Sequence, residues 1–368
     1  MSAAADQFKS SGKVREIRAY GNGHVHDTYL VTLDDPGGTK FILQRLNTRV
    51  FRQPLLVIRN ISVFTEHMVR RLEQAPSSPA RRWEIPRLIV NQNGRDYWTD
   101  SEGFFWRAIS FIEKAQSLET IQDMNQAEEV GWALATFHWL LSDLPINQLA
   151  DTLEGFHITP RYLARYDQVR TKACLNRSPE IEYGFRFVDE RRKIVGVLEE
   201  AKAQGRLRLR PIHGDPKVNN ILFDTDTGKA VGLVDLDTVK PGLLQYDIGD
   251  CLRSGCNPLG EDIDNWEMVR FEADYCRGIL QGYLPRAAQL LRPNDYACLY
   301  EAIRLIAFEL GLRFFTDFLE GDIYFKVTRS QQNLIRALVH FKLTESIESQ
   351  ERVIRTLIQE IRGEVHAD

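Results

Sequence analysis

The 368-residue sequence lacks several features that mark common classes of protein. It contains no run of about 18 apolar residues, the length that a membrane-spanning helix needs. Its first ten residues, MSAAADQFKS, have no apolar core, so we expect no signal peptide. It has no basic excess either, because 47 Lys and Arg stand against 51 Asp and Glu, for a net charge of −4. We therefore expect a cytoplasmic protein that binds neither a membrane nor nucleic acid.

Cysteine is also sparse, and its spacing excludes a cysteine-bound metal. The five cysteines are an odd number and form no CxxC pair. Free thiols in a reducing compartment are the expected state. They are Cys174, Cys251, Cys256, Cys276 and Cys298.

What is present is typical of a globular protein, with 43% hydrophobic and 27% charged residues. A chain of this length usually divides its core, so we expect two lobes. Residues 29–33 and 40–46 are apolar segments that flank the turn DDPGG, which predicts a hairpin. A helix is expected after Pro54, with Val57, Ile61, Phe64, Met68 and Leu72 on one face. Two more strands are expected within 95–99 and 104–112.

Helical periodicity dominates after Lys114, with helices expected over 126–141 and 189–204 and again from residue 255. Short strands are expected within 211–237. The fold class predicted is α+β, with a small β-rich lobe over 1–112 and a larger helical lobe over 113–368. His138, inside the first of these helices, is interpreted as a packed core histidine.

The stretch IHGDPKVNNILFD (212–224) carries the most specific chemistry. Asp215 can accept a proton from a substrate hydroxyl, and Asn220 can ligate a hard cation. The next apolar segment, AVGLVDLD, ends in two carboxylates, Asp235 and Asp237. Magnesium favours a few such oxygen ligands together with phosphate oxygens and water. This layout is typical of phosphoryl transfer from ATP, with Mg²⁺ as the metal.

The N-terminal lobe should supply contacts to the phosphates. Gly21 and Gly23, beside His24, would let backbone N–H groups approach them, although a hairpin turn explains the glycines equally well. The following strand, FILQRLN, lacks the lysine that kinases place there. Arg45 is the first candidate for that role and Gln44 the alternative, and the two side chains point to opposite faces.

Two acidic positions have open interpretations. Glu66, on the helix after Pro54, is the candidate partner of the phosphate-binding cation, but it lies off the apolar stripe and a solvated glutamate fits equally. In the segment PGLLQYDIGD, Asp247 and Asp250 could be surface charges. For Asp247 we favour a structural role, in which its carboxylate accepts backbone N–H bonds from the loop around Asp215.

The motifs HGDPKVNN, LVDLD and YDIGD resemble those of the aminoglycoside phosphotransferase and choline kinase superfamily, which has a protein-kinase-like fold. YGNGHVHDTYLV, FILQRLNTRVF and ELGLRFFTDFLEGDIYF are similar to one branch, the N-acetylhexosamine 1-kinases, and the likeness spans about residues 20–341. The resemblance implies transfer of the γ-phosphate of ATP to the anomeric hydroxyl of GlcNAc or GalNAc. It implies a role for each matching residue: Asp215 as base, Asn220 and Asp235 as magnesium ligands, Gly21, Gly23 and His24 over the phosphates, Arg313 and Tyr324 on the sugar, Asp237 at the metal or the sugar, and residues 251–265 lining the sugar side.

Other interpretations stay open at this point. Arg313 has helical spacing to Glu309 and Asp317, so a salt bridge would explain it, and core packing would explain Tyr324. The acceptor could instead be choline, an aminoglycoside or homoserine. The missing lysine also fits a catalytically silent nucleotide-binding module. We expect a monomer or a weak homodimer.

Overall fold

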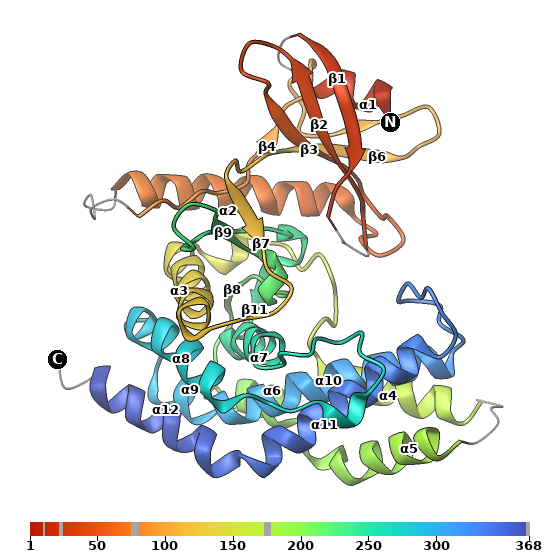
Figure 1. Cartoon of the computed structure of the whole chain (residues 1–368), viewed down its shortest axis with the longest axis vertical. Helices are drawn as coiled ribbons and strands as arrows, with labels where there is room; N and C mark the ends of the chain where they lie inside the picture. The colour runs from red at the N-terminus through yellow and green to blue at the C-terminus, as the bar shows by residue number, and fades with distance from the viewer. Residues whose placement is uncertain (10–11, 22–24, 75–80, 173–177, 366–368) are drawn as a thin grey trace.

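The computed structural model describes residues 1–9, 12–21, 25–74, 81–172 and 178–365. It has a β-rich N-terminal part and a larger helical part, which confirms the predicted α+β class (Figure 1). The N-terminal sheet has the order β1-β2-β3-β6-β4, with β5 paired to β6, and all its pairings are antiparallel. Its strands are β1 (Lys13–Ala19), β2 (Asp27–Asp34), β3 (Lys40–Arg45), β4 (Leu88–Ile89), β5 (Trp98–Thr99) and β6 (Phe105–Ser110).

The hairpin predicted around DDPGG is confirmed as β2 paired with β3. Alternate side chains of the sheet, among them Val31, Leu33 and Leu43, are buried together with the short helix α1 (Ser2–Phe8). Burial of one face fixes the register, in which Thr28 lies opposite Gln44 and Asp27 opposite Arg45. Gln44 and Arg45 therefore face opposite sides of the sheet.

Helix α2 (Pro54–Gln74) lies between the sheet and the helical part (Figure 1). Its predicted apolar stripe is confirmed, since Val57, Ile61, Phe64 and Met68 are buried. Asn60 is buried on the same helix, and its amide donates to Ala150 O at 2.9 Å and to Val239 O at 3.0 Å. These bonds attach α2 to the helical part.

The helical part contains one large apolar core. Helices α3 and α8 can approach closely because Gly131 has no side chain. A Cβ at this position would lie only 1.9 Å from Ile279 O. The single helix expected over 189–204 is wrong, since α5 ends at Arg191 and α6 begins only at Val197. The helices are α3 (Met124–Leu140), α4 (Thr159–Arg170), α5 (Pro179–Arg191), α6 (Val197–Ala203), α7 (Leu244–Gly255), α8 (Ala273–Ala287), α9 (Pro293–Ala297), α10 (Leu299–Leu319), α11 (Gln332–Ser349) and α12 (Glu351–Val365).

Two small sheets lie between α2 and the main helices (Figure 1). One has the order β10-β9-β7 and the other pairs β11 with β8. Their strands are β7 (Ala115–Ser117), β8 (Arg210–Ile212), β9 (Ile221–Asp224), β10 (Ala230–Leu233) and β11 (Lys240–Gly242), with 3₁₀ turns η3 (Val218–Asn220) and η4 (Leu236–Thr238). The loops at their ends carry the residues that the sequence singled out.

Two further features bear on the expectations above. None of the helices in the described ranges is long and apolar enough to cross a membrane. Four cysteines, Cys251, Cys256, Cys276 and Cys298, are buried free thiols, and Cys174 lies outside the described residues.

Candidate active site

The loop that follows β8 is held by one buried carboxylate. Asp247, in α7, accepts the backbone N–H of His213 at 2.6 Å and that of Gly214 at 2.8 Å. His138 lies with its Nε2 2.8 Å from the same carboxylate and its Nδ1 2.8 Å from the Tyr283 hydroxyl. Burial favours a raised pKa for Asp247, but the hydrogen bonds from His138 and His213 outweigh it and lower the pKa. The structural role predicted for Asp247 is confirmed, and so is the buried packing of His138.

The loop is also tied to the turn after β10. His213 Nε2 donates to Val234 O at 3.0 Å, and Thr238 Oγ1 donates to His213 O at 2.8 Å. Gly214 has φ of +87°, and a Cβ there would meet Thr238 O at 2.8 Å. Only glycine fits both the left-handed backbone and this close approach.

Asp215 follows this glycine and carries the candidate base. Its side chain keeps 28% of its surface exposed, and its Oδ2 lies 3.1 Å from Lys217 Nζ and 3.1 Å from Asn220 Nδ2. Burial raises the pKa of Asp215, the neighbouring Asp250 and Asp235 raise it further, and Lys217 opposes them. A reachable carboxylate with a raised pKa is suited to accept a proton from a hydroxyl.

Asn220 and Asp235 are neighbours because they stand at one end of the β9–β10 hairpin. Ile221 pairs with Leu233, and the Val234 N–H donates to Asn220 O at 2.9 Å. The Asn220 amide nitrogen is used by Asp215, which leaves its Oδ1 available. Asp235 is exposed and makes no side-chain capping bond to η4.

This donor set fits Mg²⁺, which needs only one or two protein oxygens beside those of a nucleotide. An all-protein cage is not offered, since no group of three or more His, Cys, Asp or Glu within the described ranges could hold a metal.

A buried cation joins the sheet to the same turn, and sequence reasoning missed it. Arg107, in β6, forms a two-pronged ion pair with Asp237, with its Nη2 2.6 Å from Oδ2. Both side chains are 1% exposed. His26 Nε2 lies 3.1 Å from Asp237 Oδ2. The only signal in the sequence was an arginine inside the apolar segment FFWRAISFI.

Asp237 was expected to help at the metal or to face the sugar, and this geometry corrects that expectation. Both of its oxygens are occupied by Arg107, one of them also by His26. Burial favours a raised pKa for Asp237, but the charges and hydrogen bonds of Arg107 and His26 outweigh it and hold the pKa far below its ordinary value. Its side chain is therefore a structural link rather than a free ligand.

Arg313, in α10, stands among three aromatic rings. Its guanidinium stands 5.1 Å from the ring centres of Phe156 and Tyr162 and 5.5 Å from that of Phe325. Burial favours a lower pKa for Arg313, but Tyr162, Tyr324, Glu309 and Asp215 raise it. Asp215 is therefore one of the charged groups in the electrostatic environment of Arg313.

The alternative of a salt bridge for Arg313 is wrong in this structure. Glu309 instead faces His157 Nδ1 at 3.0 Å and accepts from Thr159 Oγ1 at 2.6 Å. Asp317 accepts the backbone N–H groups of residues 323–325 at 2.7–3.0 Å. Within the ranges that the structure describes, Arg313 has no ion-pair or hydrogen-bond partner.

Tyr324 lies on the exposed rim of this region. Its side chain is 54% exposed, and its ring meets Phe325 edge-on at 4.8 Å. Core packing, the alternative interpretation of Tyr324, is therefore wrong.

Two residues in and just after α7 carry a buried oxygen without a partner, and one of them, Asn257, belongs to residues 251–265, which were expected to line the sugar side. Asp250 is 4% exposed, so the interpretation as a surface charge is wrong. Its Oδ1 accepts from Arg253 Nε at 2.8 Å, while its Oδ2 is buried without a partner. Asn257 Oδ1 is unpartnered in the same way. Unsatisfied buried acceptors are uncommon and indicate a place for a donor.

A phosphotransferase enzyme family model matches residues 16–290. The chain belongs to this family. Three solved structures share its fold: an aminoglycoside phosphotransferase from Alicyclobacillus acidocaldarius (13% identity, 100% of this chain and 97% of that chain, TM-score 0.63), a microcompartment-associated aminopropanol kinase (17%, 96% and 97%, 0.63) and a choline kinase from Cryptosporidium parvum (12%, 95% and 93%, 0.57). The protein is thus a small-molecule phosphotransferase.

The phosphate-facing residues predicted for this phosphotransferase lie in different places. Gln44 accepts from Arg107 at 2.7 and 3.0 Å and donates to Thr28 at 3.1 Å, on the side of the sheet that faces Asp237. Arg45 faces away, pairs with Asp27 and stacks over Phe104 at 4.5 Å. This geometry favours Gln44 over Arg45.

Glu66 and the glycine loop before β2 were also expected near the phosphates. Glu66 is exposed and forms no ion pair with any residue in the described part of the chain, which is the solvated interpretation. Gly21 has φ of +72° with open space where a Cβ would lie. Gly23 and His24 lie outside the described residues.

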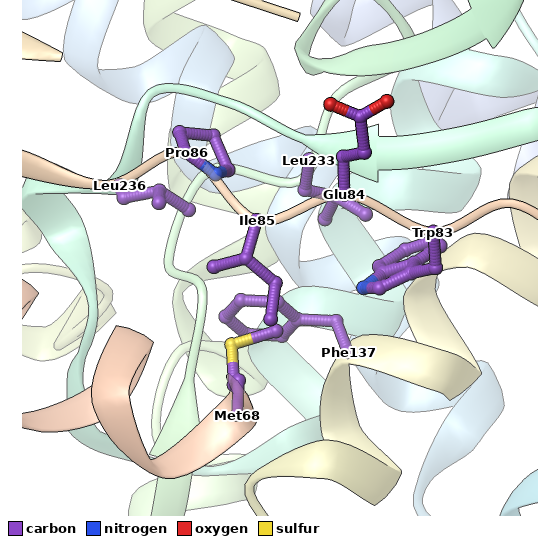
Figure 2. A pocket seen from close by; sticks show the side chains of 8 residues that line it. All are labelled: Met68, Trp83, Glu84, Ile85, Pro86, Phe137, Leu233 and Leu236. Atoms are coloured by element: carbon purple, nitrogen blue, oxygen red, sulfur yellow. The ribbon is translucent and has the colours of Figure 1, made fainter. Parts of the chain in front are cut away.

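Two cavities of the phosphotransferase lie apart from Asp215. One, of about 10 Å³, is closed by apolar side chains of Met68, Ile85, Phe137 and Leu236 from four segments (Figure 2). It has room for about one water and no ligand. The other, of about 430 Å³, is lined by Asp262, Asp264, Lys326, Thr328, Arg329, Gln332 and Arg336, close in sequence to the Tyr324 rim.

Proposed function

We propose that this phosphotransferase is an ATP- and Mg²⁺-dependent sugar 1-kinase, which phosphorylates the C1 hydroxyl of an N-acetylhexosamine such as GlcNAc or GalNAc. The acceptor class is proposed from Arg313, a half-buried cation that has no ion-pair partner in the described chain. Its guanidinium can donate to ring hydroxyls or to an acetamido oxygen. The resemblance of ELGLRFFTDFLEGDIYF to the N-acetylhexosamine 1-kinases supports the specific sugar.

The environment of Arg313 supports a neutral acceptor over a cationic one. Lys217 pairs with Asp215, and Arg253 pairs with Asp250 and lies 3.7 Å from Glu261. These pairings leave Arg313 as a cation without an ion-pair partner in the described chain, and its positive charge opposes a second cation beside it. A choline, aminopropanol or aminoglycoside ammonium needs carboxylates or an aromatic cage free of a resident cation. Here the cage of Phe156, Tyr162 and Phe325 already surrounds a guanidinium.

Buried hydrogen-bond acceptors support a hydroxyl-rich ligand. Asp250 Oδ2 and Asn257 Oδ1 have no donor from the described chain, and an acceptor rich in hydroxyls would supply donors. Tyr324 would cover the sugar from the rim.

In the proposed mechanism Asp215 orients the C1 hydroxyl and takes its proton as that oxygen attacks the γ-phosphorus. The bond between the γ-phosphorus and the bridging oxygen breaks in the same step, and ADP leaves. Lys217 keeps Asp215 in place through their 3.1 Å contact. Asn220 and Asp235 would hold Mg²⁺, which neutralises phosphate charge when bound. Gln44 and the loop with Gly21, Gly23 and His24 would position the nucleotide from the N-terminal lobe, which we assign to residues 1–112, with residues 113–368 as the catalytic and acceptor lobe.

The test is a set of incubations with Mg-ATP and GlcNAc, GalNAc, glucose, choline or an aminoglycoside, each followed by proton-coupled ³¹P NMR. A phosphate at C1 of an N-acetylhexosamine is the expected product. Product on choline or the aminoglycoside alone would retain the kinase chemistry and overturn the sugar acceptor. Binding of ATP without any product would favour the silent nucleotide-binding module.

A further inference from the structure

A buried ion pair links the N-terminal sheet to the turn that carries Asp235. Arg107 comes from β6, and Asp237 lies in η4 at the end of β10. The pair is two-pronged and excluded from solvent, with both side chains 1% exposed. A two-pronged Arg–carboxylate contact fixes direction as well as distance.

Further hydrogen bonds attach this pair to two other strands of the sheet. His26 Nδ1 accepts the Asn47 N–H at 3.0 Å, so its Nε2 carries the proton that is donated to Asp237. Gln44 Oε1 accepts from Arg107 at 2.7 and 3.0 Å. Asp237 is therefore joined to β6 directly, to the start of β2 through His26 and to β3 through Arg107 and Gln44.

The exposed carboxylate of Asp235 stands two residues before this anchor. Its backbone is left-handed, with φ of +62°, a conformation that a non-glycine residue keeps only when its surroundings impose it. The turn is fixed on one side by the Val234 N–H to Asn220 O bond and on the other by Asp237. Thr152 Oγ1 also donates to Asp237 O at 3.2 Å.

We propose that the Arg107–Asp237 pair is a positioning device that holds Asp235 in register with the nucleotide-binding sheet. The inference rests on the proposed function, because that function assigns Asp235 as a magnesium ligand. Arg107 is a positioning residue in this scheme, since its buried guanidinium acts through Asp237. Such a pair is not needed for stability alone, because a buried ion pair can often be replaced by neutral groups without loss.

The experiment measures metal binding directly, with Mn²⁺ in place of Mg²⁺. Free Mn²⁺ is followed by EPR in the presence of saturating AMP-PNP, and unfolding temperature is recorded for every variant. Arg107→Met and Asp237→Asn should each weaken Mn²⁺ binding by about 10–100-fold, the usual effect of losing a group that orients a metal ligand. Arg107→Lys, which keeps the charge but not the fork, should show a smaller loss.

The double variant Arg107→Met/Asp237→Asn separates positioning from folding. It removes both charges, so its unfolding temperature should recover relative to the single variants, whereas Mn²⁺ binding should remain weak. Recovery of both quantities would overturn the proposal, and so would normal Mn²⁺ binding in Arg107→Met.

Arg82→Met is the matched control. Arg82 pairs with Asp224 at 2.7 Å, another arginine–aspartate pair, which joins the segment before β4 to the end of β9. This variant should bind Mn²⁺ as the unmodified protein does, and an equal loss would mean that any such pair suffices. The acceptor takes no part in the assay, so a wrong sugar would leave the result intact, whereas absence of Mn²⁺–nucleotide binding in the unmodified protein would overturn the proposed function itself.

Discussion

The loop from His213 to Asn220, which carries Asp215, and the acceptor side around Arg313 differ in how many of their polar groups have partners within the chain. In the loop, backbone N–H groups donate to Asp247, and His213 and Asn220 both have partners within the chain. On the acceptor side, Arg313 has no ion pair, and Asp250 and Asn257 each keep a buried oxygen without a donor.

This difference separates chemistry from specificity. A loop whose backbone is held by hydrogen bonds before substrate arrives needs little reorganisation at the moment of reaction. One side-chain oxygen of this loop, Asn219 Oδ1, is itself buried without a donor. Groups left unsatisfied in a buried site gain most from a ligand that supplies the missing partners, and they reject ligands that do not. The loop should therefore tolerate a change of acceptor, whereas the acceptor side should not.

The largest effect is expected from replacing the proposed base, Asp215, on the loop side. Asp215→Asn should lower kcat by about 10²–10⁴-fold, because the amide cannot take the hydroxyl proton. Its unfolding temperature should stay close to that of the unmodified protein, since Asp215 has a raised pKa and its charge is not favoured by folding. Steady-state kinetics with the acceptor identified by NMR provide the measurement.

Asp226→Asn is the matched control, because Asp226 is an exposed aspartate of the β9–β10 turn that pairs at 3.3 Å with Lys114, which is exposed as well. It should keep normal turnover. Near-normal turnover in Asp215→Asn itself would refute the assignment of the base.

Removal of the carboxylate that holds the loop should have the next largest effect. Asp247→Ala leaves the N–H groups of His213 and Gly214 without acceptors and His138 without its partner. Each buried donor left unsatisfied costs about 1–3 kcal/mol. We expect a lower free energy of unfolding in urea and a kcat that falls more than the acceptor KM rises. A kcat unchanged at full stability would contradict the idea that Asp247 holds the loop in its active shape.

The sequence predicted the positions of the loop residues well and missed the buried pair that links the sheet to the turn after β10, for a physical reason. Asp215, Asn220 and Asp247 lie in short segments whose spacing constrains what their side chains can reach. Arg107 and Asp237 are 130 residues apart, and an arginine in an apolar strand carries no local sign of its partner. The same limit explains why Arg45 was preferred to Gln44, since only the fold shows which face of β3 meets Arg107. Glu66 fitted a family pattern, but its place off the apolar stripe was the better guide to its exposure.

Loss of the unpaired arginine tests the acceptor side. Arg313→Met should raise the acceptor KM by about 10–100-fold, which corresponds to the 1.5–3 kcal/mol typical of hydrogen bonds to a charged group. Because Arg313 makes no ion pair within the described chain, the unfolding temperature should change little. The affinity for nucleotide, measured by calorimetry, should not change.

Arg165→Met gives the control for this variant. Arg165 lies on α4, and it pairs at the surface with Glu320, the residue that follows α10. Its acceptor KM should be normal. If Arg313→Met increased turnover of choline while that of the amino sugar stayed unchanged, the neutral acceptor would be refuted.

The smallest effect concerns the buried pair that supports the loop from the acceptor side. His157 Nε2 donates to Gly214 O at 2.7 Å, and its Nδ1 faces Glu309 at 3.0 Å. Burial favours a lower pKa for His157, but the ion pair with Glu309 outweighs it and raises the pKa above 6.5.

A histidine whose pKa is raised in the folded state stabilises the protein fully below pH 6.5, and this contribution is lost as the pH rises through the folded-state pKa. The unfolding temperature should therefore fall with rising pH above 6.5, by about 2–4 °C for each kcal/mol lost. In His157→Gln this part of the pH dependence should disappear, because glutamine can donate to Gly214 O without titrating. A slope that persists unchanged in His157→Gln would show that the loop and the acceptor side are not coupled through this histidine.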